Sequence, residues 1–313
     1  ITGVQLDSRL LREGDLFLAC FGRNHDARDY IDKAIDVGVA AILADADDNW
    51  EGVQVIGNVP VVAIDNLPAK ISEIAARFYS RPSEKLTVIG ITGTNGKTSC
   101  SQFIAQALAE ANFKCGLIGT LGYGIYGDLK ETQLTTPDAV FTQMALAEMV
   151  VDGVDPVVME VSSVGLHQKR VKKVQFETAI FTNLTRDHLD YHGSMEAYAE
   201  NKKKLFTAKG LKHAIVNLDD PYALSIINSI AKGVEVSTYS INKSIATVHA
   251  EELSLNRHGF EARICTPIGS GIVKGRLIGY FNFSNLLAVT AALLSYLPAR
   301  KEVNIDELCQ GIS

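Results

Sequence analysis

A glycine-rich segment, LTVIGITGTNGKT at residues 86–98, combines the residue types that bind phosphate groups. Gly93 and Gly96 allow the backbone to turn tightly and to point its N–H groups inward. Lys97 adds a positive charge, and Thr98 adds a hydroxyl group that can bind Mg²⁺. The generic pattern has a glycine five positions before Gly96. In this chain that position is Ile91, and the glycine is Gly90. The segment predicts a phosphate-binding loop, and the alternative is a glycine turn with an incidental lysine.

The residues on either side supply the strand and the helix that such a loop needs. Residues 86–91 are rich in β-forming side chains. After Lys97, apolar residues recur at helical spacing, at Phe103, Ile104, Ala107, Leu108 and Ala111. We therefore expect the loop to lie at the N-terminus of a helix, where free N–H groups and the helix dipole favour anions.

An acidic residue and a histidine follow two further predicted strands. Glu160 lies near the end of a strand at 156–161, and His188 follows a strand at 178–181. Parallel strands end at the same edge of a sheet, so a carboxylate and an imidazole could converge there on a metal ion beside a nucleotide. Taken singly, such loop residues are usually solvated. The lysine run at 202–204 lies on a predicted helix and would ordinarily be a solvated face.

Strand-like and helix-like segments alternate along most of the chain, which predicts an α/β fold with a mostly parallel sheet. The break at residues 80–83, which contains Pro82, separates a first unit at 1–83 from a second unit at 84–313. In the first unit the pattern predicts strands at 15–19, 40–43 and 61–64 and helices at 29–37 and 67–79. In the second it predicts a helix at 139–151 and strands at 86–91, 114–118, 156–161, 178–181 and 214–216. Shorter strands at 234–239, 249–255, 259–265 and 271–277 predict an antiparallel appendage.

The composition is that of an ordinary soluble globular protein, with 47% hydrophobic and 21% charged residues among 313. The net charge of −6 argues against a general nucleic-acid binder. Five scattered cysteines indicate reduced thiols in the cytoplasm and neither a disulfide framework nor a zinc site. No apolar run approaches membrane-spanning length, and the N-terminus lacks a signal-peptide pattern. Both ends look cut, because the chain begins without Met and stops at the start of a predicted helix.

Several motifs resemble those of the Mur ligase family: GITGTNGKTS (90–99), LTTP (134–137), MEVSSVGL (159–166), FTNLTRDHLDYHG (181–193) and GYFNFSNLLA (279–288). The N-terminal segments resemble one branch of that family, the one that adds a diamino acid to UDP-MurNAc-L-Ala-D-Glu: DSR (7–9), GDLFLAC (14–20) and DARDYIDKAIDVGVAAI (26–42). The resemblance implies an N-terminal α/β domain at 1–83 that binds the uridine substrate. It also implies a central ATP-binding domain at 84–313, similar to P-loop NTPases, with an antiparallel appendage.

The resemblance also implies roles for residues around ATP. The ATP phosphates would be bound by Gly93, Thr94, Asn95, Gly96, Lys97, Thr98 and Ser99. Thr98, Glu160 and His188 would surround one Mg²⁺. Lys202 would be carbamylated and help to hold a second Mg²⁺, while Lys203 and Lys204 would be solvated. Asn282 and Asn285 would meet the adenine. The groups implied to act in catalysis are Lys97, Glu160, His188 and Lys202.

The resemblance also implies a set of residues that bind the acceptor nucleotide, UDP-MurNAc-L-Ala-D-Glu. Its central part would be held by Thr135, Thr136, Ser162, Gln168 and Arg170, and its uridine end by Leu6, Ser8, Arg23, Asn24 and His25. A guanidinium group suits this task, because it pairs bidentately with phosphate or carboxylate. The chain departs from the family at Val164, where the family usually has histidine. It also stops before the family's third domain.

The activity implied by the resemblance is an ATP-dependent amide ligation in the bacterial cytoplasm, through an acyl phosphate, in peptidoglycan precursor synthesis. The partners would be UDP-MurNAc-L-Ala-D-Glu and either meso-diaminopimelate or L-lysine, with no nucleic acid and no membrane insertion. The alternatives are another Mur ligase, a ligase like folylpolyglutamate synthetase, a nucleotide-binding module without turnover, and a plain P-loop ATPase or GTPase. We expect residues 1–313 alone to bind both nucleotides and to form no product.

Overall fold

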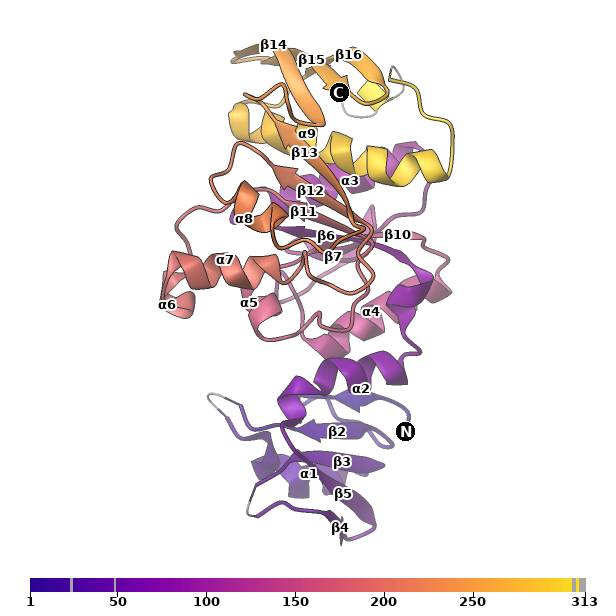
Figure 1. The fold of residues 1–313 in the computed structure, drawn as a ribbon. Helices are drawn as coiled ribbons and strands as arrows, with labels where there is room; N and C mark the ends of the chain where they lie inside the picture. Colours follow the sequence, from indigo (N-terminus) through magenta and orange to yellow (C-terminus); the bar gives the residue numbers. More distant parts are fainter. Residues whose placement is uncertain (23–24, 48, 306–307, 310–313) are drawn as a thin grey trace.

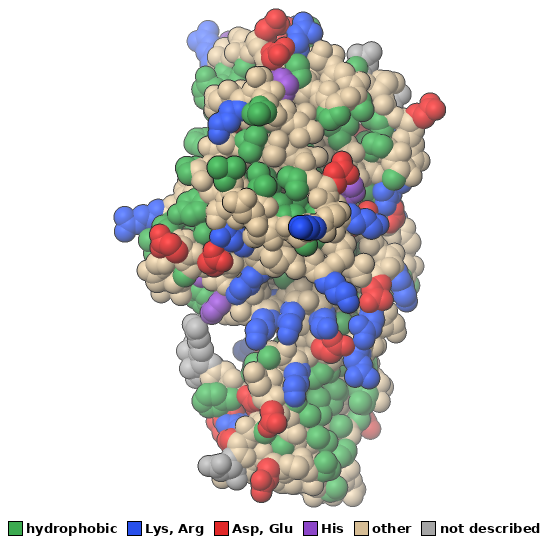
Figure 2. All heavy atoms as spheres, in the orientation of Figure 1, with side chains coloured by type: hydrophobic (Ala, Val, Ile, Leu, Met, Phe, Trp, Pro, Cys, Tyr) green, Lys and Arg blue, Asp and Glu red, His purple; other side chains and the backbone are tan. Residues whose placement is uncertain are grey.

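The structure is a computed structural model that describes residues 1–22, 25–47, 49–305 and 308–309. The strands form two sheets, one of five strands and one of eleven. The smaller sheet occupies one end of an elongated molecule and the larger sheet lies in the rest (Figure 1). Lys and Arg side chains gather on one face of the region where the two parts meet (Figure 2).

The smaller sheet has the strand order β1-β2-β3-β5-β4 and is parallel except for the last pair. Its strands are β1 (Val4–Gln5), β2 (Leu16–Ala19), β3 (Ala41–Asp45), β4 (Val53–Ile56) and β5 (Val59–Ile64). Its helices are η1 (Ala27–Tyr30), α1 (Ile31–Val37), η2 (Leu67–Ala69) and α2 (Ile71–Phe78). Gly38 ends α1 in the left-handed conformation, with φ of 86°. The sequence prediction missed β1, which has two residues, and β4, whose Val53 and Val55 are exposed at the sheet edge.

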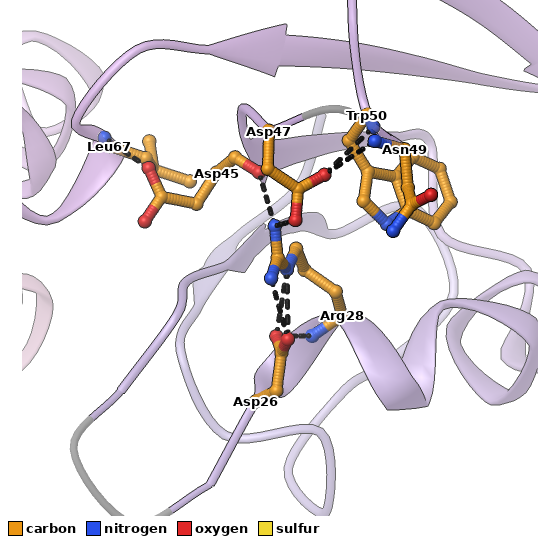
Figure 3. A network of polar contacts seen from close by, with 7 residues as sticks. All are labelled: Asp26, Arg28, Asp45, Asp47, Asn49, Trp50 and Leu67. Atoms are coloured by element: carbon orange, nitrogen blue, oxygen red, sulfur yellow. Dashed lines mark hydrogen bonds and ion pairs between the residues drawn. The ribbon is translucent and has the colours of Figure 1, made fainter.

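A polar network fixes the segment that enters η1 (Figure 3). The Arg28 guanidinium donates to both carboxylate oxygens of Asp26, with Nη2 at 2.7 Å from Oδ2. Its Nη1 donates to Asp47 Oδ2 at 2.5 Å and to the Asp45 carbonyl at 3.0 Å. Hydrogen bonds from Arg28 hold the pKa of Asp26 below its usual value. The network ties the start of η1 to the end of β3.

A short segment connects the two parts. Ser80 and Arg81 adopt left-handed φ values of 59° and 50°, and Pro82 opens the 3-10 helix η3 (Pro82–Lys85). Across the junction, Ser72 Oγ accepts from the Lys173 N–H at 3.0 Å. The division into domains at 1–83 and 84–313 stays a prediction.

The larger sheet has the order β16-β15-β14-β13-β12-β11-β6-β10-β7-β8-β9. Its parallel centre consists of β6 (Thr87–Thr92), β7 (Gly116–Gly119), β10 (Pro156–Glu160), β11 (Thr178–Phe181), β12 (His213–Asn217) and β13 (Glu235–Ser240). Antiparallel pairs extend it at both ends, through β8 (Gly122–Ile125), β9 (Asp128–Lys130), β14 (Val248–Asn256), β15 (Gly259–Thr266) and β16 (Gly269–Gly275). The predicted α/β class, with a mostly parallel sheet and antiparallel strands, is confirmed.

Two details of that prediction are wrong. The sequence pattern assigns residues 234–239 to the antiparallel appendage, but β13 pairs in parallel with both β12 and β14. The antiparallel part therefore starts at β14 and continues the main sheet. The pattern also misses the hairpin of β8 and β9, because its strands are short and glycine-rich.

Helices cover both faces of the larger sheet. They are α3 (Lys97–Glu110), α4 (Ala139–Val151), α5 (Ser163–His167), α6 (Leu189–His192), α7 (Met195–Lys203), α8 (Ala223–Ile227) and α9 (Tyr280–Tyr296), followed by η4 (Leu297–Ala299). Ile89 and Ile91 of β6 face a core shared with α3 and α9, whereas Val88 faces the core of α4 and α7. This alternation explains why all six residues of β6 are buried.

One described segment, Tyr280–Ala299, is long and apolar enough to cross a membrane, contrary to the expectation that no run approaches that length. Of that segment's 18-residue window, 67% is buried inside the protein. Its helix α9 packs against α3 and the strands of the larger sheet. A core helix meets the same test of length and hydropathy, so the segment is weak evidence for a membrane span.

Candidate functional site

The phosphate loop connects β6 to α3, as predicted. Gly93 has φ of 156°, and a Cβ atom there would collide with Thr182 Oγ1. Gly96 is the N-cap of α3 with φ of 85°, and a Cβ atom there would collide with Asn285 Oδ1. Both positions therefore need glycine, for space and for backbone conformation.

We expect Gly96→Ala to lower the free energy of unfolding by about 1–3 kcal/mol, because the left-handed backbone and the contact with Asn285 both oppose a side chain. Gly127→Ala is the matched control, since Gly127 has φ of 92° and a Cβ atom there would have nothing within 4 Å. Urea unfolding of the two variants separates backbone strain from the collision. Equal losses of unfolding free energy in the two variants would show that the contact with Asn285 adds nothing to the cost of the Gly96 substitution.

The turn after β11 holds the phosphate loop in place. Asn183 Oδ1 accepts from the Asn95 N–H at 2.9 Å, and Asn183 Nδ2 donates to the Asn95 carbonyl at 3.1 Å. Thr94 Oγ1 accepts from the Thr185 N–H at 3.0 Å. Ser99, half-buried, lies in the first turn of α3. The loop is thus shaped by side-chain contacts that do not depend on a ligand.

Two lysines converge on one carbonyl oxygen of this loop. Lys97 Nζ donates to the carbonyl of Gly93 at 2.9 Å and to that of Thr94 at 2.9 Å. Lys202 Nζ donates to the same Gly93 carbonyl at 2.8 Å. Burial lowers the pKa of Lys97, and the carboxylates of Glu160 and Asp187 oppose that shift.

Lys202 is buried, with 1% of its surface exposed, although a lysine run on a helix is usually solvated. Its amine also lies 4.4 Å from the ring centroid of Tyr198. Burial, followed by repulsion from Lys97, lowers the pKa of Lys202 well below its usual value. Lys203 is partly exposed and pairs with Glu200 at 2.5 Å, and Lys204 is exposed. Within the run, Lys202 is therefore buried, whereas Lys203 and Lys204 are accessible to solvent.

Glu160, at the end of β10, is 1% exposed and lies among hydroxyl groups. Its Oε2 accepts from Thr98 Oγ1 at 2.9 Å and from Thr120 Oγ1 at 3.1 Å, and its Oε1 accepts from the Thr120 N–H at 3.0 Å. Two oxygen ligands on one Mg²⁺ lie about 2.9 Å apart when each metal–oxygen bond is about 2.0–2.1 Å and the geometry is octahedral. The spacing of the Thr98 and Glu160 oxygens is compatible with a shared Mg²⁺, and that shared ion stays a prediction.

His188 lies on the exposed turn before α6, with φ of 52°. Its Nε2 is 3.6 Å from Asp187 Oδ2, and its ring meets that of Tyr198 at 6.2 Å between centroids. Tyr198 in turn contacts Thr94 through its hydroxyl at 3.2 Å. His188 thus borders the phosphate loop through Tyr198, and a shared metal with Glu160 stays a prediction.

The residues expected to hold the acceptor nucleotide form one connected group in the larger part. Thr136 Oγ1 donates to the Glu160 carbonyl at 3.0 Å and accepts from the Ser162 N–H at 2.9 Å. Arg170 Nη1 donates to the Thr136 carbonyl at 2.6 Å, and its Nη2 donates to Gln168 Oε1 at 2.7 Å. Burial lowers the pKa of Arg170. The group begins at the backbone of Glu160, the residue that also contacts the phosphate loop.

The remaining predicted positions are spread more widely. Thr135 Oγ1 lies 3.0 Å from Thr120 Oγ1. Asn285 is buried against Gly96, whereas Asn282 caps the Ile278 carbonyl at 3.0 Å. Leu6, Ser8 and His25 belong to the smaller part of the molecule, and Arg23 and Asn24 lie outside the described residues. Their roles stay predictions.

Sequence reasoning missed Thr120 and His192. Thr120 directly follows β7, the neighbour of β10, so the rule that placed Glu160 at the sheet edge could also have found it. His192 Nε2 lies 2.9 Å from Ser163 Oγ, and the His192 ring stacks on Tyr198 at 5.1 Å. Burial lowers the pKa of His192. Its position between α5 and α7 depends on tertiary packing that no local pattern encodes.

A separate group of possible metal ligands lies on the antiparallel strands. The ligand atoms of His249, Glu251 and Cys265 fall within 4.8 Å of one another, although no zinc spacing was visible in the sequence. All five cysteines lie within the described residues, and none of them forms a disulfide there. The group on the antiparallel strands is separated from β6 by β13, β12 and β11, so it takes no part in the site at the phosphate loop.

A glycine-rich loop between a buried parallel strand and a helix that starts with lysine defines a nucleotide-binding protein of the phosphate-loop class. Comparison with known families narrows the class. The Mur ligase middle domain matches residues 91–293, and the description "Mur ligase family, catalytic domain" matches residues 1–79. The chain belongs to the Mur ligase family.

Individual relatives agree with this assignment. The UDP-N-acetylmuramoyl-L-alanyl-D-glutamate--2,6-diaminopimelate ligases of Coxiella burnetii and Pseudomonas aeruginosa are each 46% identical, over 94% of this chain and 60% of the relative. A solved structure with the same ligase title has a TM-score of 0.84 at 31% identity, covering 99% of this chain and 62% of the other. The chain therefore spans about 60% of the length of the curated relatives it matches.

Proposed function

We propose that the protein containing this chain is an ATP-dependent amide ligase that adds a diamino acid to UDP-MurNAc-L-Ala-D-Glu in peptidoglycan precursor synthesis. One observation carries the proposal: Glu160 links the two halves of the site. Its carboxylate accepts a hydrogen bond from Thr98 of the phosphate loop, and its carbonyl accepts one from Thr136. Thr136 in turn accepts hydrogen bonds from the Ser162 N–H and from Arg170. The names of the relatives support the same substrates.

In the proposed reaction, the D-Glu side-chain carboxylate attacks the γ-phosphorus of ATP and ADP leaves. The amine of the diamino acid then attacks the carbonyl carbon of the acyl phosphate, loses a proton and displaces inorganic phosphate. Phosphoryl transfer needs positioning and charge neutralisation more than a protein nucleophile. The N–H groups of the loop and Lys97 would orient the phosphates, and Lys97 would stabilise the charge that develops on them. Bound Mg²⁺, held by Thr98 and Glu160 with His188 beside them, would neutralise phosphate charge.

The proposal includes carbamylation of Lys202, which converts a cation into a carboxylate-like group for a second Mg²⁺. Its burial and lowered pKa support this, because only a neutral amine reacts with carbon dioxide. The proposal also places the enzyme in the bacterial cytoplasm, which the five reduced cysteines support.

The decisive experiment is an assay of the complete protein with ATP, UDP-MurNAc-L-Ala-D-Glu and each diamino acid offered separately. We expect tripeptide product with one of meso-diaminopimelate and L-lysine. Phosphate release that needs no acceptor nucleotide would instead favour a plain ATPase. For residues 1–313 alone, we expect ATP and the acceptor nucleotide to bind and no tripeptide product to form. This stretch by itself would then act as a nucleotide-binding module without turnover.

We expect Arg170→Ala to weaken binding of the acceptor nucleotide about 10- to 100-fold, the loss typical of one or two charge-assisted hydrogen bonds. ATP affinity should stay within about twofold, since the guanidinium contacts Thr136 and Gln168 and not the phosphate loop. Calorimetry with each ligand measures both. Arg257→Ala is the control, because Arg257 is exposed in the turn between β14 and β15. Equal weakening of both ligands by Arg170→Ala would contradict the assignment.

A further inference from the structure

A cavity of about 620 Å³ lies in the larger part of the molecule. Its walls include the segments that lead into three parallel strands, 81–84 before β6, 171–176 before β11 and 204–210 before β12. These segments mark the amino-terminal edge of the sheet. The phosphate loop and Glu160 lie at the carboxyl ends of β6 and β10, which is the opposite edge. The cavity is therefore distinct from the phosphate loop, whereas its lining residues Lys169 and Val171 adjoin Arg170 of the group expected to hold the acceptor nucleotide.

The cavity is strongly cationic in a chain whose net charge is −6. Six basic side chains line it, against one carboxylate, Glu84: Arg81, Lys169, Lys172, Lys173, Lys204 and Lys209. A second carboxylate, Glu73, forms ion pairs with Arg81 and Lys173. The two acidic groups leave a surplus of about four positive charges, and basic side chains gather on this region of the surface in Figure 2.

Several of these cations lack a counter-charge. Within the described residues, the side chains of Lys169, Lys172 and Lys209 have no hydrogen bond or ion pair, and Lys204 donates to the neutral amide of Asn201 at 2.6 Å. Burial and repulsion from Lys169 lower the pKa of Lys204. Lys169 also adopts a left-handed backbone, with φ of 59°. A multivalent anion would relieve the repulsion among these groups.

The cavity has the size and lining of a small-molecule site. Its volume falls within the range of about 300–1,000 Å³ that is usual for such sites. Apolar residues line it together with the cations: Leu166, Val171, Val174, Phe176, Leu205 and Ala208. A nucleic acid would more often follow an extended basic stripe, whereas a localised hollow of this volume, partly open to solvent, favours a compact ligand.

We propose that this cavity binds a small polyanion with two or more linked phosphate groups, separately from any nucleotide at the phosphate loop. Cations from three segments would surround the phosphates, and the apolar lining would accept the rest of the ligand. Arg81 belongs to the segment that connects the two parts of the molecule. Bound anion would therefore join this segment to the loops before β11 and β12 and raise the melting temperature.

The test is calorimetric titration of inorganic tripolyphosphate, without Mg²⁺, into chains that carry Lys97→Ala to weaken the phosphate loop. In that background, Lys172→Ala with Lys209→Ala should raise the Kd for tripolyphosphate at least about tenfold, because two unpaired cations are removed. Lys33→Ala with Lys232→Ala is the matched control, since it removes the same charge from exposed positions elsewhere. The Kd of the control variant for tripolyphosphate should stay within about twofold of the value for the Lys97→Ala chain.

Three outcomes would overturn the proposal. Unchanged affinity in the cavity variant would place the anion elsewhere, and equal weakening in both double variants would show only a response to net charge. Single-stranded DNA that competes as well as tripolyphosphate at equal phosphate concentration would identify a nucleic-acid surface. The ligase assay reports separately on the proposed function, because it depends on the phosphate loop and not on Lys172 or Lys209.

Discussion

Lys97→Ala is expected to lower ATP affinity about 10- to 100-fold, the factor that corresponds to losing one or two charge-assisted hydrogen bonds. Product formation by the complete protein should fall further, by about 10²–10³, because the positive charge also acts on charge that develops during phosphoryl transfer. The fold should persist, since Lys97 is only partly buried and contacts two loop carbonyls. Calorimetry with ATP and the ligase assay measure the two effects.

Lys130→Ala provides the control for this variant. Lys130 is an exposed lysine on β9 that pairs with Glu148 at 3.3 Å, so its loss removes the same charge without touching the loop. Urea unfolding shows whether each variant remains folded. Undiminished ATP affinity in a folded Lys97→Ala chain would reject the phosphate-loop assignment.

Lys202→Ala is expected to reduce activity of the complete protein at least about 100-fold, if its carbamate holds a metal ion as proposed. Small carboxylic acids should restore part of this activity by occupying the vacated space. Carbamate on the unmutated chain should increase as the pH rises, because the lowered pKa of Lys202 makes the neutral amine more available and its fraction grows with pH. Carbon-13 NMR with labelled bicarbonate detects the modification directly.

Two controls keep this prediction specific. Lys203→Ala changes the neighbouring, partly exposed lysine and should leave both activity and the carbamate signal in place. Lys202→Met retains most of the buried volume, so it separates lost chemistry from lost packing. Full activity of a folded Lys202→Met protein, without added acid, would remove the proposed role.

The sequence predicted best where periodicity and a local signal coincide. The helix α4 matches its predicted bounds, because Asp138 caps its first N–H groups and a long apolar run follows. The strand β11 also matches, since all four residues are buried and apolar or β-branched. The phosphate loop was recognisable because its glycines, lysine and threonine are adjacent in sequence.

What escaped prediction depends on packing between distant segments. The lysine run by itself does not distinguish Lys202 from Lys203, and only the family resemblance singled out Lys202. Its burial comes from the placement of α7 beside the phosphate loop. The pairing of β13 could not be inferred, because strand direction is set by the connections and not by residue type. The cationic cavity likewise joins three segments that are far apart in the chain.

The shared carbonyl of Gly93 couples two amines that lie 105 positions apart in the sequence. Because the charge of Lys97 contributes to the lowered pKa of Lys202, the protonation of Lys202 depends on what Lys97 contacts. An anion beside Lys97 offsets its charge and raises the pKa of Lys202. By thermodynamic reciprocity, loss of the Lys202 proton weakens anion binding at Lys97.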